Sequence, residues 1–437
     1  MMTSKYLIPL FALMGSMAAV AGCSSDASDD AASAGASQAG ASGRGTTGGA
    51  PNKAGSGNGG SDAMPEAGTG GSDAGAGGSD AGEEFTPPSD PGKGGFLVTV
   101  SGEDLAAVGY DWTSASLSDG DPPAFVDGWA VKFEHVIVTV ANVHVNADPD
   151  KDDGNPQDVG PLVASDDGPY AVDATIGGDV VGKSESSDEK TIPIAAFAKQ
   201  DNGKAFDLEA RYAFSYDLIP ASPDAKLTNL DAEGRALYAE AKEKGWSMIY
   251  AGTATYQGPE PEADSVFAKM PTEVKFTLGL TNPSSYINCR NTDLTAVGDE
   301  FPRGIQASAT KSTIVQITVH TDHGFWDTLN VEGTPLHFDP IAANSSTYGM
   351  PTKPGVVTIE DLVDVDVSGF TTKNGDPLPW RSLVSDYTAP TGQMKYDTNG
   401  TSFKRVNSFA SYLAYSAASG GHMNADGECE VKNNFKP

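Results

Sequence analysis

Histidine and aspartate side chains gather in the last third of the sequence, which holds four of the six histidines. Several follow directly after an alternating apolar segment, residues 312–319, and another follows a glycine pair at 420–421. Imidazole nitrogens and carboxylate oxygens at strand ends are donors that Zn²⁺ or Cu²⁺ can take. We therefore predict a site for one of these ions. The expected ligands are His320, Asp322, His323 and His422, with His337 or Asp327 as a further ligand.

A structural role for these residues is the competing interpretation. Imidazole and carboxylate groups at a polar strand-to-loop junction can instead complete hydrogen bonds of the backbone. The segment also lacks a signature such as His-Glu-x-x-His, which would identify a metal site more specifically. Both interpretations stay open at this point.

Residues 318–323 resemble the His-x-His-x-Asp-His motif of metallo-β-lactamase-like hydrolases. The resemblance implies that Asp322 and His323 bind a metal ion that activates water. Thr318, however, stands where that motif has its first histidine, and the predicted order of elements departs from that fold. A metal-dependent hydrolase using His320, Asp322 and His323 is therefore an alternative function. The sequence leaves open whether the protein is an enzyme and favours a non-catalytic role.

An acidic segment, residues 148–154, resembles the start of a calcium loop of the helix–loop–helix type. The match breaks at its sixth position, Asp153, where the loop needs Gly, and at its twelfth, Val159, where it needs Glu. We therefore predict a solvated hairpin turn, with weak Ca²⁺ binding as the alternative. The carboxylates concerned belong to Asp148, Asp150 and Asp152.

The first residues of the chain resemble the signal peptides of bacterial lipoproteins. Lys5 supplies a positive charge, residues 6–19 are apolar but too short to span a bilayer, and Val20-Ala21-Gly22-Cys23 matches a lipobox. The resemblance implies cleavage before Cys23 and lipidation of that residue, and Ser24 in the next position implies the outer membrane. We therefore expect a cell-envelope protein that is anchored to the outer membrane by lipid.

Composition separates a tether from a folded region. Residues 24–84 consist mainly of Gly, Ala, Ser and Asp, so they cannot bury a core and are predicted to be disordered.

The whole chain has a formal net charge of −31, which repels nucleic acid and anionic lipid headgroups. The expected partners are therefore the membrane, through the lipid anchor, and an envelope or surface protein, with nucleic acid excluded.

The remaining sequence predicts a mainly β fold. Segments rich in Val, Ile, Tyr, Phe and Thr recur between turn signals, and residues 211–216 place three aromatic side chains on one face. We expect a β-sandwich with a few packed helices and an α+β C-terminal part. Helices are predicted at residues 231–244, after 358, and at 402–419. Strands are predicted at residues 96–101, 129–145, 191–197, 211–218, 246–256, 274–281 and 312–320.

The predicted organisation of the chain has four parts. A signal peptide would cover residues 1–22, and the lipidated Cys23 with its linker would extend to residue 93. A β-sandwich lobe would follow at 94–290, and a mixed α/β lobe at 291–437 would pack on it or form one domain with it.

The cysteines agree with export from the cytoplasm. Once Cys23 carries lipid, Cys289 and Cys429 remain as an even pair in an oxidising compartment. We therefore predict a disulfide between them.

Several segments of the folded region resemble an uncharacterised family of bacterial lipoproteins. The similarity lies in residues 129–135, 253–255, 319–327, 338–342, 421–422 and 427–429, and it includes the pattern His-x-Asp-His-x-Phe-x-Asp that begins at His320. Residues 136–173 are also loosely similar to β-sandwich domains of other bacterial lipoproteins. These resemblances imply a fold and bring no activity with them. A surface adhesion or envelope-assembly module without metal is therefore a second alternative function.

Overall fold

The structure is a computed structural model of the chain. It describes residues 85–113, 124–152, 154–183, 189–298, 300–331, 334–346, 356–368, 370–371, 374–384, 401 and 406–434. The expected signal peptide, the expected lipidation at Cys23 and most of the expected tether lie outside these residues. No helix within the described ranges is both long and apolar enough to cross a bilayer. The described part is mainly β, as predicted, and is built from two open sheets.

The smaller sheet has five strands and joins distant parts of the chain. Its central strand, β1 (Phe96–Ser101), pairs in parallel with β13 (Thr313–Val319) and antiparallel with β6 (Lys190–Phe197). The short strands β15 (Gly421–Met423) and β5 (Val180–Val181) form its two edges. The end of β1 and the end of β13 therefore meet at the same edge of the sheet.

The larger sheet is organised around β2 (Trp129–Ala147), a strand of 19 residues that is buried along most of its length. On its two sides β2 pairs antiparallel with β7 (Arg211–Leu218) and β9 (Met248–Tyr256). The remaining strands of this sheet are β3 (Leu162–Asp166), β4 (Tyr170–Asp173), β8 (Lys226–Thr228), β10 (Glu273–Leu280), β11 (Ser284–Ile287), β12 (Ile305–Gln306), β14 (Val356–Thr358) and β16 (Glu430–Asn433).

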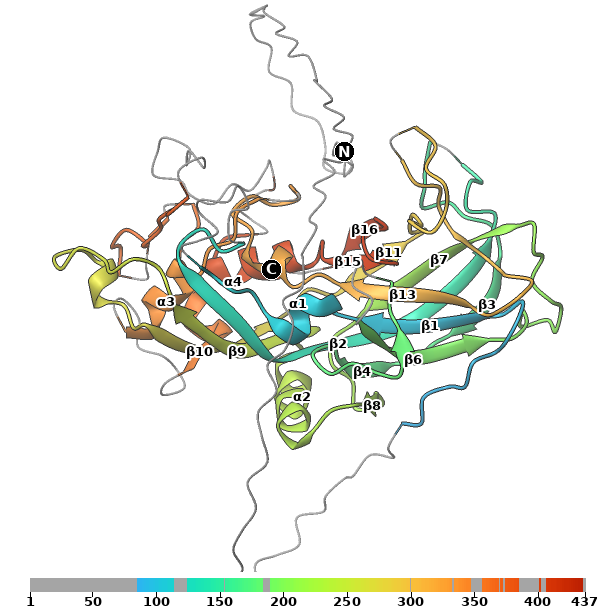
Figure 1. Cartoon of the computed structure of the whole chain (residues 1–437), viewed down its shortest axis with the longest axis horizontal. Helices are drawn as coiled ribbons and strands as arrows, with labels where there is room; N and C mark the ends of the chain where they lie inside the picture. Colours follow the sequence, from blue (N-terminus) through green and yellow to red (C-terminus); the bar gives the residue numbers. More distant parts are fainter. Residues whose placement is uncertain are drawn as a thin grey trace, which may run out of the picture. The chain divides into compact units, whose positions relative to one another are not determined.

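The two sheets share one hydrophobic core. Phe96, Val98 and Val100 of β1 are fully buried and belong to the same apolar cluster as the buried side chains of β2. The ring centroids of Phe96 on β1 and Tyr212 on β7 lie 6.2 Å apart. Figure 1 shows β1, β13 and β6 lying across β2 and β7. Each sheet hides one face against the other, which is the predicted β-sandwich.

The helix α2 (Ala232–Lys244) confirms both of its predicted ends. The side chain of Asp231 accepts a hydrogen bond from the backbone N–H of Gly234, which caps the first turn. Gly245 closes the helix with a φ of 72°, in the left-handed conformation that glycine adopts without a steric penalty.

Two other helices are shorter than predicted. The helix α4 (Phe409–Ala417) begins late in the expected range 402–419, because a capping box of Ser408 and Ser411 sets its first turn; residues 402–405 lie outside the described part. The capping box of Thr358 and Asp361 is present but begins only a single 3₁₀ turn, η4 (Ile359–Leu362). The other helical segments are α1 (Glu103–Val108), η2 (Phe267–Lys269), η3 (Asp322–Phe325) and α3 (Asp339–Ser346).

The two predicted lobes, 94–290 and 291–437, are interleaved in both sheets. In the smaller sheet β1 pairs with β13, and in the larger sheet β10 pairs with β14 and β11 with β16. The disulfide between Cys289 and Cys429 is also present and joins the end of β11 to the start of β16. The C-terminal segment is therefore held by strand pairing and by a covalent bond.

Candidate metal centre

Strand pairing brings His320 and His422 together. In the antiparallel pair of β13 and β15, Thr318 lies opposite His422, and the backbone N–H of His320 donates to the carbonyl of Gly420 at 2.8 Å. His320 lies two residues beyond Thr318, so its side chain leaves the same face of the sheet as that of His422. The two rings are nearly parallel, with centroids 4.3 Å apart.

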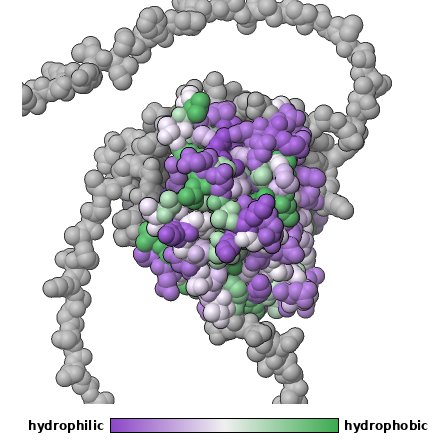
Figure 2. Space-filling view, turned by 90° about the vertical axis from the view of Figure 1, so that its right-hand side faces the viewer, coloured by the Kyte–Doolittle hydropathy of each residue, from purple (hydrophilic) through white to green (hydrophobic). Residues whose placement is uncertain are grey.

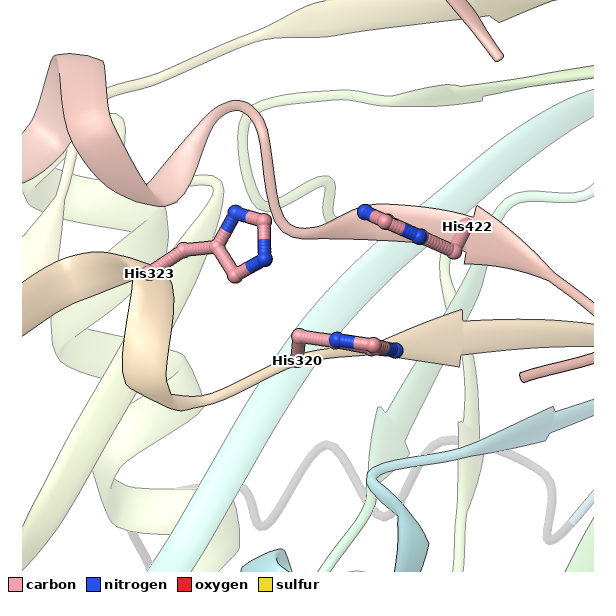
Figure 3. A group of neighbouring side chains, drawn as sticks. All are labelled: His320, His323 and His422. Atoms are coloured by element: carbon pink, nitrogen blue, oxygen red, sulfur yellow. The ribbon is translucent and has the colours of Figure 1, made fainter. Parts of the chain in front are cut away.

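His323 reaches this pair from the turn η3. Its ring centroid lies 5.5 Å from that of His320 and 5.4 Å from that of His422, and its plane is close to perpendicular to both (Figure 3). One ring nitrogen from each histidine lies within 4.8 Å of the other two. We call these three residues the histidine trio. This group could hold a metal ion.

Two glycines allow the trio to assemble. A Cβ at position 420 would lie 2.7 Å from the carbonyl oxygen of His320 and 3.4 Å from the Cβ of His323. A Cβ at position 324 would lie 2.9 Å from the ring of Tyr250. Gly420 and Gly324 therefore let β15 and the turn η3 come close to the end of β13.

Hydrogen bonds decide which nitrogen of His323 is available. The Oγ of Ser419 lies 2.8 Å from Nδ1 of His323, and the same hydroxyl donates to the carbonyl of Ser416 at 2.7 Å. Because a hydroxyl has one proton, Oγ accepts from Nδ1–H. Nε2 of His323 then carries the lone pair that a metal ligand needs. The ring also stacks on Trp326, with centroids 3.6 Å apart.

Burial keeps two members of the trio neutral. His323 is 3% exposed and His422 is 5% exposed. Burial, with a smaller contribution from the neighbouring imidazoles, lowers the pKa of His422 to about 3 and that of His323 well below its usual value. Both rings are therefore uncharged at pH 7, in the form that binds a metal ion.

His320 differs because carboxylates surround it. Burial by itself would lower its pKa, but the negative charges of Glu103, Asp322 and Asp426 outweigh burial and raise it. Oε1 of Glu103 lies 3.8 Å from Nε2 of His320. Burial raises the pKa of Glu103 itself to about 7. A cation near His320 would therefore be close to several acidic groups.

Glu103 was not predicted from the sequence, and the reason is topological. Ser101 is paired with Thr318 in the parallel ladder of β1 and β13, so Glu103 and His320 each lie two residues beyond a paired position. No local pattern in the sequence connects the two strands. Only the parallel pairing of β1 with β13 places Glu103 beside the trio.

Asp322, a predicted ligand, is not part of the trio. It is the first residue of η3, and its Oδ2 accepts a hydrogen bond from Nε1–H of Trp326 at 3.1 Å. Its carboxylate therefore holds the indole that stacks on His323. Asp322 therefore supports His323 through Trp326 and is not among the side chains that converge in the trio.

His337 and Asp327, the other predicted ligands, lie in a separate buried cluster. Nε2 of His337 is 3.3 Å from Oδ2 of Asp327, and Nδ1 is 3.8 Å from Oδ2 of Asp127. The ring stacks on Trp380, with centroids 4.4 Å apart. Neither residue belongs to the trio. Both nitrogens of His337 face carboxylates, so the structure does not bring this ring to the predicted site.

The same cluster extends to Asp339 and Arg381. Asp127 accepts the backbone N–H groups of Phe338 at 2.6 Å and Asp339 at 2.7 Å. Asp339 pairs with Arg381, whose Nε lies 2.9 Å from Oδ2. Burial raises the pKa of Asp339 to about 6 and that of Asp127 well above its usual value. We call Asp127, Asp327, His337, Asp339 and Arg381 the His337 cluster.

The acidic segment after β2 gives no converging set of carboxylates among the described residues. Asp150 forms an ion pair with Arg211, and Oδ1 of Asp152 accepts the backbone N–H of Gly154 at 2.9 Å. Asp148 is exposed and has a positive φ of 51°, as in a turn. These contacts agree with the predicted hairpin turn.

Comparison of the chain with protein-family models, with curated proteins and with solved structures found no match.

Proposed function

We propose that this protein binds a transition-metal ion, Zn²⁺ or Cu²⁺, through His320, His323 and His422. The observation that carries the proposal is the convergence of three largely buried imidazoles, each with one nitrogen within 4.8 Å of the others. Imidazole suits both ions, and three of them form a known donor set for zinc. Two neutral rings and a hydrogen-bonded Nδ1 on His323 further support a ligand role.

Two ring nitrogens of the trio lack a hydrogen-bond partner within the described residues. Within the described ranges, Nε2 of His320 and Nδ1 of His422 are buried and have no hydrogen-bond partner. A buried polar atom without a partner costs about 1–3 kcal/mol. Each ring can offer only one nitrogen to a metal ion, and that nitrogen must carry no proton, so the other nitrogen still needs an acceptor.

The enclosed position of the trio favours binding over hydrolysis. A hydrolytic centre needs an open coordination position for water and substrate. The side chain of His320 is only 12% exposed, and His323 and His422 are more deeply buried. Asp322, which a hydrolase of the resembled type would use as a ligand, is engaged by Trp326. We therefore prefer metal retention to turnover.

In the setting that the sequence predicts, lipid on Cys23 would anchor this metal-binding region to the outer membrane. The disulfide supports an oxidising compartment such as the cell envelope. On the coloured part of the face in Figure 2, hydrophilic side chains predominate and apolar ones form small separate groups. A large apolar patch would favour an adhesion or assembly surface, so this face gives that alternative no support.

Metal content tests the proposal directly. The full-length protein would be purified from the cell envelope without chelator or polyhistidine tag, and its metals measured by mass spectrometry. We expect about one Zn²⁺ or Cu²⁺ per chain, and less than about a tenth of that in a His320→Ala/His323→Ala variant. His144→Ala, which removes a half-buried histidine of β2, is the matched control and should keep its metal.

Two results would overturn the proposal. One is a folded wild-type protein that retains neither ion after incubation with it and dialysis. The other is a double variant that keeps its metal, which would place the site elsewhere. Circular dichroism of all three proteins separates loss of metal from loss of fold.

A further inference from the structure

Glu103 approaches Nε2 of His320. Its Oε1 is 3.8 Å from Nε2 of His320, and its side chain is 19% exposed. In Figure 3 the nitrogen of His320 nearer to Cβ, which is Nδ1, lies on the side of His323, and the other nitrogen lies farther from His323, alongside the ring of His422. Glu103 therefore faces the nitrogen that the trio does not need.

The proton on His320 requires an acceptor at this position. A neutral imidazole has one N–H, so a ring that binds a metal ion through Nδ1 carries its proton on Nε2. Within the described ranges, Nε2 is buried and has no hydrogen-bond partner. A shift of about 1 Å would bring the carboxylate of Glu103 into hydrogen-bonding distance.

The backbone supports a specific role for Glu103. Its φ is 55°, in the left-handed region that a residue with a long side chain seldom adopts. The N–H of Glu103 donates to Oγ of Ser101 at 2.8 Å, which helps to hold this conformation. A strained residue of this kind is found most often where the position of its side chain matters.

We propose that Glu103 is a positioning residue of the metal centre: its carboxylate accepts Nε2–H of His320 and its charge favours a divalent ion over a monovalent one. This inference rests on the proposed metal site. Carboxylate–histidine–metal arrangements fix the orientation of the ring and raise the basicity of the ligand nitrogen. The charge interacts twice as strongly with a divalent ion as with a monovalent ion at the same distance.

The test compares Zn²⁺ with Ag⁺ on the full-length protein. Affinities would be measured by competition with chromophoric chelators for wild type, Glu103→Gln, Glu103→Asp and Glu243→Gln. Glu103→Gln keeps the shape and removes the charge, so Zn²⁺ affinity should fall about 10–100-fold, and Ag⁺ affinity by a smaller factor. Glu103→Asp should restore part of the preference for Zn²⁺. Glu243→Gln, on the exposed surface of α2, should behave as wild type.

Each other outcome has a distinct meaning. Unchanged Zn²⁺ affinity in Glu103→Gln would overturn the role of Glu103 and leave the trio intact as a site. Equal losses for Zn²⁺ and Ag⁺ in both Glu103 variants would show a purely structural contribution and would also overturn it. A wild-type protein that binds neither ion would instead reject the metal site itself.

Discussion

Two groups of buried histidines in this protein have opposite surroundings. In the histidine trio, the ring centroids of His320, His323 and His422 lie about 4–6 Å from one another. In the His337 cluster, the single ring lies between the carboxylates of Asp127 and Asp327. Both groups are enclosed by the same fold, so burial alone does not distinguish a metal site from an internal ion-pair network.

The difference lies in how charge is balanced. The His337 cluster contains its own positive charge, because Arg381 pairs with Asp339 and stabilises the neighbouring acidic groups. In the trio, two neutral rings point toward a third that is surrounded by carboxylates, and a cation would complete the group. Each nitrogen of His337 has a carboxylate near it, whereas each ring of the trio turns one nitrogen toward the other two rings, where an ion would be a common partner.

The largest effect that separates the two groups is expected from Arg381→Met. This change leaves buried Asp339 without its cation and should lower the free energy of unfolding by about 3–5 kcal/mol. Metal content should stay that of wild type, because Arg381 is not part of the trio. Urea unfolding and metal analysis of the same preparation provide the two measurements.

A surface ion pair provides the control for this change. Lys244 pairs with Glu360, and both side chains are about a third exposed or more, so Lys244→Met should cost no more than about 1 kcal/mol. The proposed difference between the two groups would be wrong if Arg381→Met lowered the free energy of unfolding as little as the control does. It would also be wrong if a folded Arg381→Met protein lost its metal, since the two groups would then be coupled.

The pH dependence of the metal-free protein tests the neutral state of the trio. The folded pKa of His422 is about 3, below its usual value of 6.5, so the folded state binds fewer protons than the unfolded state between these values. Stability from this group is therefore complete above pH 6.5 and is lost as the pH falls toward 3. Between pH 7 and pH 5 the loss should be about 2 kcal/mol.

His422→Gln isolates that contribution because glutamine does not titrate in this range. Urea unfolding of chelator-treated wild type and variant at pH 7 and pH 5 should show a shallower pH dependence for the variant. His323 and His337 titrate in both proteins, so the difference between the two proteins reports His422. Identical pH dependence would mean that His422 is not held neutral by burial.

The sequence predicted the longer strands well. The predicted bounds of β1 and β7 agree with the structure, because β1 is a short apolar segment rich in Val and Phe, and in β7 apolar side chains recur at every second residue. Strands of two or three residues, such as β5, β8 and β12, were not predicted. Such segments are too short to show an alternation of apolar and polar residues, and they become strands only by pairing with a neighbouring strand.

The site was predicted in part, and the residues show where the limit lies. His320 and His323 are close in sequence, and His422 follows a helix end, so their types and positions pointed to them. Asp322 and His337 were equally suggestive, but Trp326 and two aspartates engage them. Which candidates converge depends on the pairing of β13 with β15 and with β1, and no spacing within one segment contains that information.

The smallest effect is expected from Asp322→Asn, which tests whether Asp322 is a metal ligand in addition to the trio. The amide oxygen can still accept Nε1–H of Trp326, so the turn η3 should keep its shape and only one carboxylate near His320 is lost. If Asp322 is outside the coordination sphere, Zn²⁺ affinity should fall only a few-fold, which corresponds to less than about 1 kcal/mol. A loss well beyond the roughly 100-fold typical of outer-sphere partners would instead make Asp322 a direct ligand. Competition with a chromophoric chelator distinguishes the two, and the second result would bring the centre closer to a hydrolase motif than the present geometry supports.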